Sequence, residues 1–263
     1  MTEEELDNFL KAANNPQFVP GIYNYCDRWC ERCQHTNKCY SYAMEQGDAF
    51  NTSKTDDLFE KLGKVFKVTM MLLEKMAKEE GFDLAMSEEA YQEFEQNEAD
   101  RAQAAKKHPL HTLSIQYLGQ VKDWNEQQQS WLEKKTETWQ QLHELELSKN
   151  SPQAEVAQLT NWLEIINWYH LMIPTKFRRA LDAVFEIAQG EEEVWRYDEM
   201  NGTAKVAMIG TERSIAAWHQ IMVNFPEQEE SILPILVQLS KLNKAAEKTF
   251  PNAIQHVRPG LDE

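Results

Sequence analysis

Long segments with apolar residues at helical spacing constrain the fold of this chain more than any other feature. In residues 56–81, Leu58, Leu62 and Val65 begin a series that recurs every three or four positions, and the period-two alternation of strands is almost absent from the chain. Glycine and proline number only nine each among 263 residues, so they rarely interrupt these segments. The sequence therefore predicts an all-α fold, a multi-helix bundle.

Capping residues and helix-breaking residues predict the boundaries of these helices. Ser151 followed by Pro152 is a strong helix start, because serine caps the first turn and proline fits within it. Pro174 is expected to end or kink that helix, since an internal proline removes a hydrogen bond. Asn201 followed by Gly202 indicates a turn. The expected helices cover residues 56–81, 87–105, 110–145, 151–174, 177–190, 203–222 and 231–248.

All four cysteines lie close together near the N-terminus. They are Cys26, Cys30, Cys33 and Cys39, spaced C-x3-C-x2-C-x5-C. Four thiolates this close in sequence suit either a tetrahedral zinc ion or a [4Fe–4S] cluster. Structural zinc sites usually join two cysteine pairs a dozen or more residues apart, and no second pair is present here. The spacing therefore favours a [4Fe–4S] cluster held by one N-terminal loop; the alternatives are one zinc ion, or thiols without metal.

Other side chains in this loop could tune such a site. His35 could replace a cysteine as a zinc ligand, although a histidine in such a loop is more often solvated or hydrogen-bonded to a sulfur. Arg28, Arg32 and Lys38 could offset the negative charge of the thiolates, or they could simply face solvent. The aromatic residues of the loop could shield the site from water or dock the loop on the bundle; they are Tyr23, Tyr25, Trp29, Tyr40 and Tyr42.

The loop resembles two kinds of iron–sulfur motif. The stretch CERCQHTNKC is similar to the end of the iron–sulfur loop in DNA glycosylases of the endonuclease III type, but Cys26 lies closer to Cys30 than that family's pattern requires. The first three cysteines have the spacing of radical-SAM enzymes, whose cluster leaves one iron open, so a fourth cysteine nearby departs from that pattern. Neither resemblance extends beyond the loop, because the chain lacks a helix-hairpin-helix motif and an alternating strand–helix pattern. Neither activity is carried over.

A broader resemblance spans most of the chain. The segments PGIYNYCDRWCERC, GTAKVAMIGTERSIAAW and VRPG resemble those of uncharacterised bacterial all-helical proteins that carry a CDRWCERC-type four-cysteine motif. The resemblance implies an all-α fold with an N-terminal cysteine motif. It implies no activity.

Composition and charge narrow the classes of partner. A formal net charge of −16 repels phosphate backbones and disfavours nucleic-acid binding. No apolar run approaches the roughly 20 residues that span a bilayer, and the start MTEEELDNFLKAANN lacks the regions of a secretory signal. We therefore expect a cytoplasmic protein, where clustered cysteines bind metal more often than they form disulfides. An unidentified protein or redox partner is expected; the sequence does not determine the oligomeric state.

The rest of the chain contains no residue pattern that indicates a catalytic site. None of the seven histidines has a glutamate three residues before it, which disfavours a di-iron centre of the ferritin type. Lys176, Arg178 and Arg179 form a basic patch that could receive an anion, although a solvated helix face is the commoner case. An enzyme stays possible only with a pocket in the bundle, lined by Trp162, Trp168, His170, Trp218 and His219.

These observations combine into one hypothesis and two alternatives. The chain divides into an N-terminal segment with the four-cysteine metal-binding loop (1–50), a helical bundle (51–250) and a C-terminal tail (251–263). The leading hypothesis is a metal-binding helical protein whose [4Fe–4S] cluster transfers electrons, senses redox state or fixes the N-terminal segment. The alternatives are an interaction scaffold stapled by zinc, without a redox role, and an enzyme with a pocket in the bundle.

Overall fold

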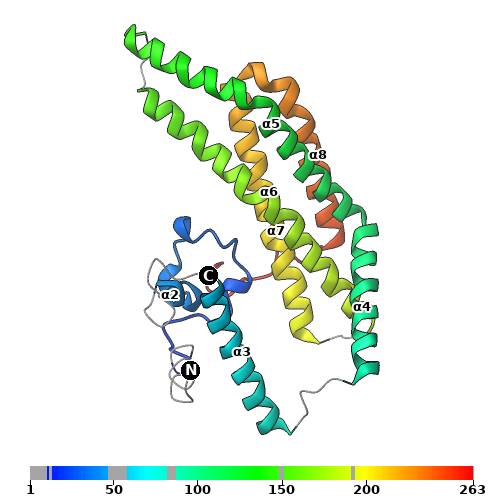
Figure 1. Ribbon diagram of the computed structural model, residues 1–263. Coiled ribbons are helices and arrows are strands. Elements are labelled where there is room, and N and C mark those ends of the chain that lie inside the picture. The colour runs from blue at the N-terminus through cyan, green and yellow to red at the C-terminus, as the bar shows by residue number, and fades with distance from the viewer. Residues whose placement is uncertain are drawn as a thin grey trace. The chain divides into compact units, whose positions relative to one another are not determined.

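The computed structural model describes residues 11, 14–46, 58–81, 87–147, 151–190 and 193–262. Most of these residues are helical and none of them forms a strand, which confirms the predicted all-α fold (Figure 1). None of the described helices is long and apolar enough to cross a membrane. The α-helices are α2 (Tyr40–Gln46), α3 (Leu58–Glu80), α4 (Glu88–Lys107), α5 (Pro109–Glu144), α6 (Pro152–Ala188), α7 (Val194–Asn224) and α8 (Glu229–Thr249), and the 3₁₀-helices are η1 (Ile22–Asn24), η2 (Cys30–Arg32), η3 (Thr36–Lys38) and η4 (Pro226–Gln228).

Contacts divide the chain into two compact units. The first comprises residues 1–100 together with 257–263, and the second comprises residues 101–256. The first unit contains the cysteine loop, α2 and α3, and the second contains α5 to α8. The chain thus returns to the first unit after His256. This division by contacts differs from the boundaries expected at residues 50 and 250. Contacts do not test whether those boundaries separate domains, so the expected domains stay a prediction.

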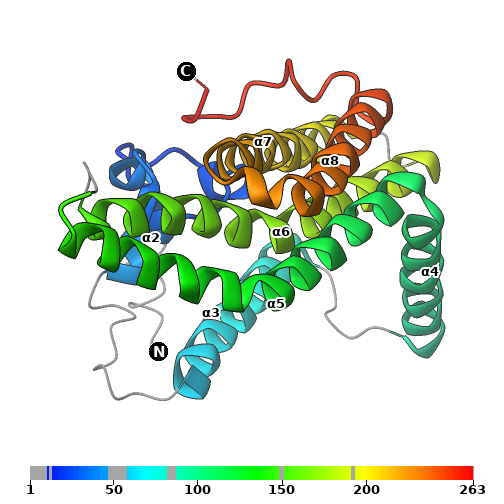
Figure 2. The same ribbon diagram turned by 90° about the horizontal axis from the view of Figure 1, so that it is seen from above.

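Helices α5 to α8 form the bundle of the second unit. Each helix packs against two others: α5 and α7 both lie beside α6 and α8 (Figures 1 and 2). Short connections join consecutive helices, so neighbours run antiparallel. The core is filled by large side chains that all four helices contribute, among them Tyr117, Tyr169, Phe177, Trp218 and Leu239, each fully buried.

Side-chain caps begin three of the helices. The hydroxyls of Ser87 and Ser151 each accept a hydrogen bond, at 3.2 Å, from the backbone amide three residues ahead, so both predicted starts are confirmed. His108 acts in the same way before α5: its Nδ1 accepts from the Leu110 amide at 3.2 Å, and Pro109 occupies the first helical position.

Two predicted interruptions are absent. Pro174 does not end α6, which continues from Pro152 to Ala188, and Asn201 and Gly202 lie inside α7. An internal proline costs roughly 3 kcal/mol, but Ile173 and Phe177 on either side of Pro174 are fully buried. Burying each such side chain contributes about 1.5–3 kcal/mol, so packing keeps the helix continuous. Gly202 is likewise buried.

The close packing of α7 on α6 predicts the effect of Gly210→Ala. A Cβ at residue 210 would lie 2.7 Å from Cδ1 of Tyr169, whose ring is fully buried. We expect the free energy of unfolding to fall by about 1–3 kcal/mol, measured by urea denaturation. Gly119→Ala is the control, because a Cβ there meets nothing within 4 Å and should raise stability by about 0.5–1 kcal/mol. Similar effects of both substitutions would contradict this account of the packing.

The capping role of His108 predicts a dependence of stability on pH. Burial lowers the pKa of His108 below its ordinary value, and the neutral ring accepts the Leu110 amide. The unfolded chain therefore binds a proton more readily, and stability falls as the pH drops below about 6.5. Asparagine can cap the helix without titrating. We expect His108→Asn to lose less stability than the wild type in denaturation between about pH 7 and pH 5; identical slopes would exclude a contribution from His108.

Candidate metal centre

Short 3₁₀-turns fold the cysteine loop. Cys30 begins η2, and Cys33 and Cys39 directly follow η2 and η3 in extended conformation. Arg28, between Cys26 and Cys30, adopts a left-handed conformation with φ of 57°. A non-glycine residue adopts this conformation uncommonly. The loop is tied to the preceding residues by the Val19 amide, which donates to the Lys38 carbonyl at 3.0 Å.

The folded loop brings all four cysteines to the wall of one small cavity. Its volume is about 20 Å³, and each of the four cysteines is half-buried. A space of this size holds about one water molecule. The remaining walls are mostly apolar or aromatic, and they include Ile22, Tyr23, Trp29, His35, Tyr42 and Leu261.

The two candidate metals require different spacings of the four sulfurs. Among the described residues, no three histidine, cysteine, aspartate or glutamate side chains are grouped closely enough to hold a metal ion. Tetrahedral zinc, with Zn–S bonds of about 2.3 Å, needs its sulfurs about 3.8 Å apart. A [4Fe–4S] cluster carries each thiolate on a different iron and needs a wider arrangement. The cavity of about 20 Å³ would have to open to admit a cluster, and the cysteines would have to move together to hold one zinc ion.

The surroundings of Cys30 disfavour its thiolate form. The pKa of the Cys30 thiol is raised, first by burial, then by the Glu45 carboxylate, and then by Cys26, Cys39 and Cys33. Each negative group disfavours the thiolate of Cys30. A metal needs its cysteine ligands as thiolates, and its positive charge would reverse this repulsion. The four cysteines therefore suit a bound metal cation, whose positive charge would offset the charge of the thiolates.

Backbone groups also bond to two of the sulfurs. The His35 amide donates to Sγ of Cys33 at 3.4 Å, and Sγ of Cys26 donates to the Tyr23 carbonyl at 3.6 Å. An amide donor stabilises a thiolate and raises the reduction potential of a cluster. The Cys26 bond needs the thiol proton, so deprotonation on metal binding must break it.

Only one of the three predicted basic residues lines the cavity. Arg28 does so, with its guanidinium 5.6 Å from the ring centre of Tyr23. Arg32 lies over the ring of Trp29 at 4.1 Å, and Lys38 does not line the cavity. Of the five aromatic residues, Tyr23, Trp29 and Tyr42 form part of the wall, whereas Tyr40 packs against Phe18 with ring centres 5.4 Å apart.

The C-terminal tail contributes to this site, which no feature of the sequence predicted. Leu261 lines the cysteine cavity, and Arg258 donates from a terminal guanidinium nitrogen to the Tyr25 carbonyl at 3.4 Å. The tail is irregular, as expected, but it belongs to the same compact unit as the cysteine loop. Its only sequence signal is the VRPG stretch, where proline and glycine indicate a turn.

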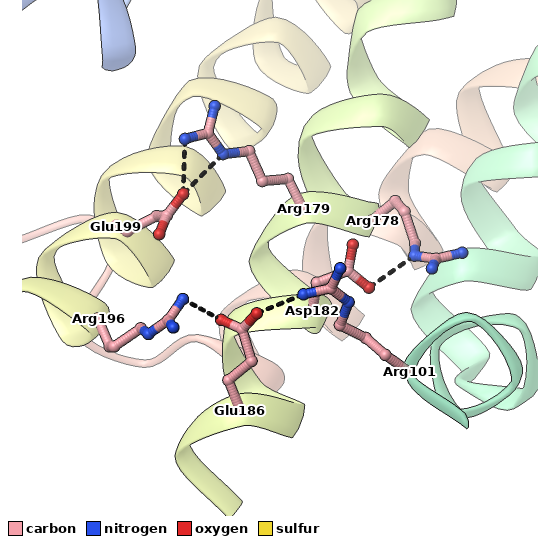
Figure 3. A network of polar contacts seen from close by, with 7 residues as sticks. All are labelled: Arg101, Arg178, Arg179, Asp182, Glu186, Arg196 and Glu199. Atoms are coloured by element: carbon pink, nitrogen blue, oxygen red, sulfur yellow. Dashed lines mark hydrogen bonds and ion pairs between the residues drawn. The ribbon is translucent and has the colours of Figure 1, made fainter. Parts of the chain in front are cut away.

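Two of the three residues of the predicted basic patch, Arg178 and Arg179, form ion pairs within the bundle. Arg178 donates to Asp182 at 2.8 Å, and Arg179 donates to one Glu199 oxygen at 2.8 and 2.6 Å (Figure 3). These pairs join α6 to itself and to α7, which favours a structural role over an anion site. The network also contains Glu186, which accepts from Arg101 and Arg196.

The five residues proposed for an enzyme pocket do not share one groove. His219 lines a groove of about 660 Å³ between α7 and α8, but Trp162, Trp168, His170 and Trp218 do not. Trp218 is fully buried instead, and its ring nitrogen donates to the hydroxyl of Tyr117 at 3.3 Å. Burial raises the pKa of Tyr117 to about 12. This cluster is part of the bundle core.

No family model matches the chain, and no similar curated protein or solved structure was found. The resemblances of the cysteine loop and of the whole chain therefore stay predictions. The function must be inferred from the residues of the chain itself.

The electrostatics of Cys30 predicts an effect of Glu45. In metal-free protein, Glu45→Gln should lower the pKa of Cys30 and speed its alkylation by iodoacetamide at about pH 8, because the thiolate is the nucleophile. Mass spectrometry of the modified peptides measures the rate. Glu31→Gln is the matched control, since it removes an equal charge from the same loop without being a cause of the Cys30 shift. Equal acceleration by both would contradict a specific effect of Glu45.

Proposed function

We propose that this chain is a metal-binding helical protein that holds a [4Fe–4S] cluster through Cys26, Cys30, Cys33 and Cys39. One observation carries the proposal: all four cysteines line a single cavity. A donor set of four cysteines is what such clusters require. The likeness of the loop to known iron–sulfur loops supports the same choice.

The residues around the cavity suit this role. A bound cluster supplies one-electron transfer at a potential set by its surroundings. The His35 amide and the nearby Arg28 guanidinium would stabilise negative charge on the ligands, and the aromatic walls would limit the access of water. The protein would then transfer electrons to a protein partner, sense redox state, or use the cluster to fix its N-terminal segment.

Zinc is the second candidate, and the size of the cavity favours it. A space of about 20 Å³ accommodates one ion with less rearrangement than a cluster. The four cysteines would have to move inward to reach tetrahedral geometry. Zinc would staple the loop, and the acidic protein would act as an interaction scaffold without a redox role.

Metal and sulfide analysis of anaerobically purified protein tests the proposal. We expect brown protein with about four irons and four acid-labile sulfides per chain. Cys30→Ser should lose most of the iron, because serine removes a thiolate ligand. Gln34→Ser is the matched control: it introduces serine at an exposed position of the same loop that does not line the cavity, and it should keep the wild-type iron content.

The possible outcomes separate the two candidates. Colourless protein with one zinc per chain, lost in Cys30→Ser, would overturn the cluster and support the zinc scaffold. Protein that binds neither metal, in cells supplied with iron and zinc, would overturn both.

A further inference from the structure

We infer that the C-terminal strap, Val257–Asp262, forms one wall of the cysteine site, and that Arg258 is a positioning residue for Cys26. The identity of the cofactor in this inference rests on the proposed function. The contacts that define the strap do not depend on it. The site would then be built from both ends of the chain.

The strap makes close apolar contact with the cysteine loop. Leu261 lines the cavity directly. Gly260 is buried with φ of +71°, and a Cβ there would lie 2.9 Å from Cγ2 of Val19 and 3.2 Å from Cδ1 of Ile22. Ile22 is itself buried, at 2% exposure, and lines the same cavity. Only glycine therefore allows the strap to approach this closely, and the approach closes the cavity on that side.

Arg258 connects the strap to the backbone beside the first cysteine. Its guanidinium donates to the carbonyl of Tyr25, the residue directly before Cys26, at 3.4 Å. Asp262 fixes that guanidinium from the other side: its oxygens accept from Nε at 3.0 and 3.1 Å and from a terminal nitrogen at 2.6 Å. The Arg258 side chain is only 15% exposed, so this arrangement is ordered by packing as well as by charge.

The geometry of the strap itself is determined locally. The Arg258 amide donates to Asp262 at 3.0 Å, and the Leu261 amide donates to the Arg258 carbonyl at 3.1 Å. These bonds close a turn that presents Gly260 and Leu261 to the loop and the guanidinium to Tyr25. Loss of the Arg258 side chain would remove both its ion pair with Asp262 and its hydrogen bond to the Tyr25 carbonyl.

Two consequences follow for the site. Cys26 directly follows Tyr25, so a fixed Tyr25 carbonyl restricts where the Cys26 sulfur can reach. Leu261 and Ile22 cover the cavity and hinder the entry of solutes. We therefore expect the strap to slow the loss of the cofactor, as outer residues of metal sites do when they orient ligands.

The rate of iron loss tests this inference. Protein purified anaerobically with its iron is mixed with a ferrous chelator, and release is followed by absorbance, together with the reduction potential of the cluster. We expect Arg258→Ala to lose iron about 10-fold faster than the wild type or more, and Arg258→Lys, which retains a donor, to fall between them. Arg178→Ala is the matched control, because it removes an equivalent arginine–aspartate pair, four residues apart, from the second unit. Equal rates and potentials for Arg258→Ala, Arg178→Ala and wild type would overturn the inference.

A second measurement separates this inference from the proposed function. If the wild type holds no cluster, the proposed function fails, but the strap still predicts faster alkylation of Cys26 in metal-free Arg258→Ala than in Arg178→Ala. Unchanged alkylation would overturn the strap independently of any metal.

A pair of glycine variants tests the strap without removing a charge. Gly260→Ala and Gly81→Ala both place alanine at a positive φ, but only the Cβ at residue 260 meets other atoms within 4 Å. Both variants should keep the helical content of the wild type by circular dichroism, since most helices lie in the second unit. Gly260→Ala alone should accelerate iron loss and Cys26 alkylation. Equal behaviour of the two variants would show that the close approach of the strap has no role.

Discussion

The packing of four cysteines around one small cavity is the constraint on which the N-terminal part of this structure depends. The sulfurs line one half-buried cavity, where burial, Glu45 and the other three cysteines all oppose a thiolate at Cys30. Four thiolates in such a space need positive charge among them. Among the described residues of the cavity wall, Arg28 is the one arginine or lysine, so the proposed metal would supply most of that charge. The proposal of a metal centre rests on this set of four cysteines as well as on the likeness of the loop to known motifs.

The same constraint explains why the site involves both ends of the chain. A loop of short 3₁₀-turns has little apolar surface with which to exclude water, since none of the residues in η2 and η3 is buried. The strap supplies part of what the loop lacks, with Leu261 on the cavity wall and Gly260 packed against Val19. In contrast, the bundle of the second unit is held by its own core and by the ion pairs of α6 and α7 (Figure 3). Arg178, Arg179 and Arg196 take part in these ion pairs.

Local sequence signals predicted much of the fold. Helical spacing identified the all-α class, and the serines at 87 and 151 marked helix starts because a cap depends only on the next three residues. Pro174 was expected to end or kink its helix; it does not end it, because burial of Ile173 and Phe177 against neighbouring helices outweighs a local cost. The four cysteines were evident from their spacing alone. Arg258 and Leu261 were not, since contacts across more than 200 residues leave no local pattern.

Anomalous diffraction from anaerobically grown crystals tests the central claim most directly, because it locates and identifies metal atoms within the protein. Data collected on both sides of the iron absorption edge should show a compact group of about four iron atoms inside the cavity, bonded to Cys26, Cys30, Cys33 and Cys39. A single peak that appears only above the zinc edge, or a cavity without any anomalous scatterer in crystals of iron-replete protein, would contradict the account.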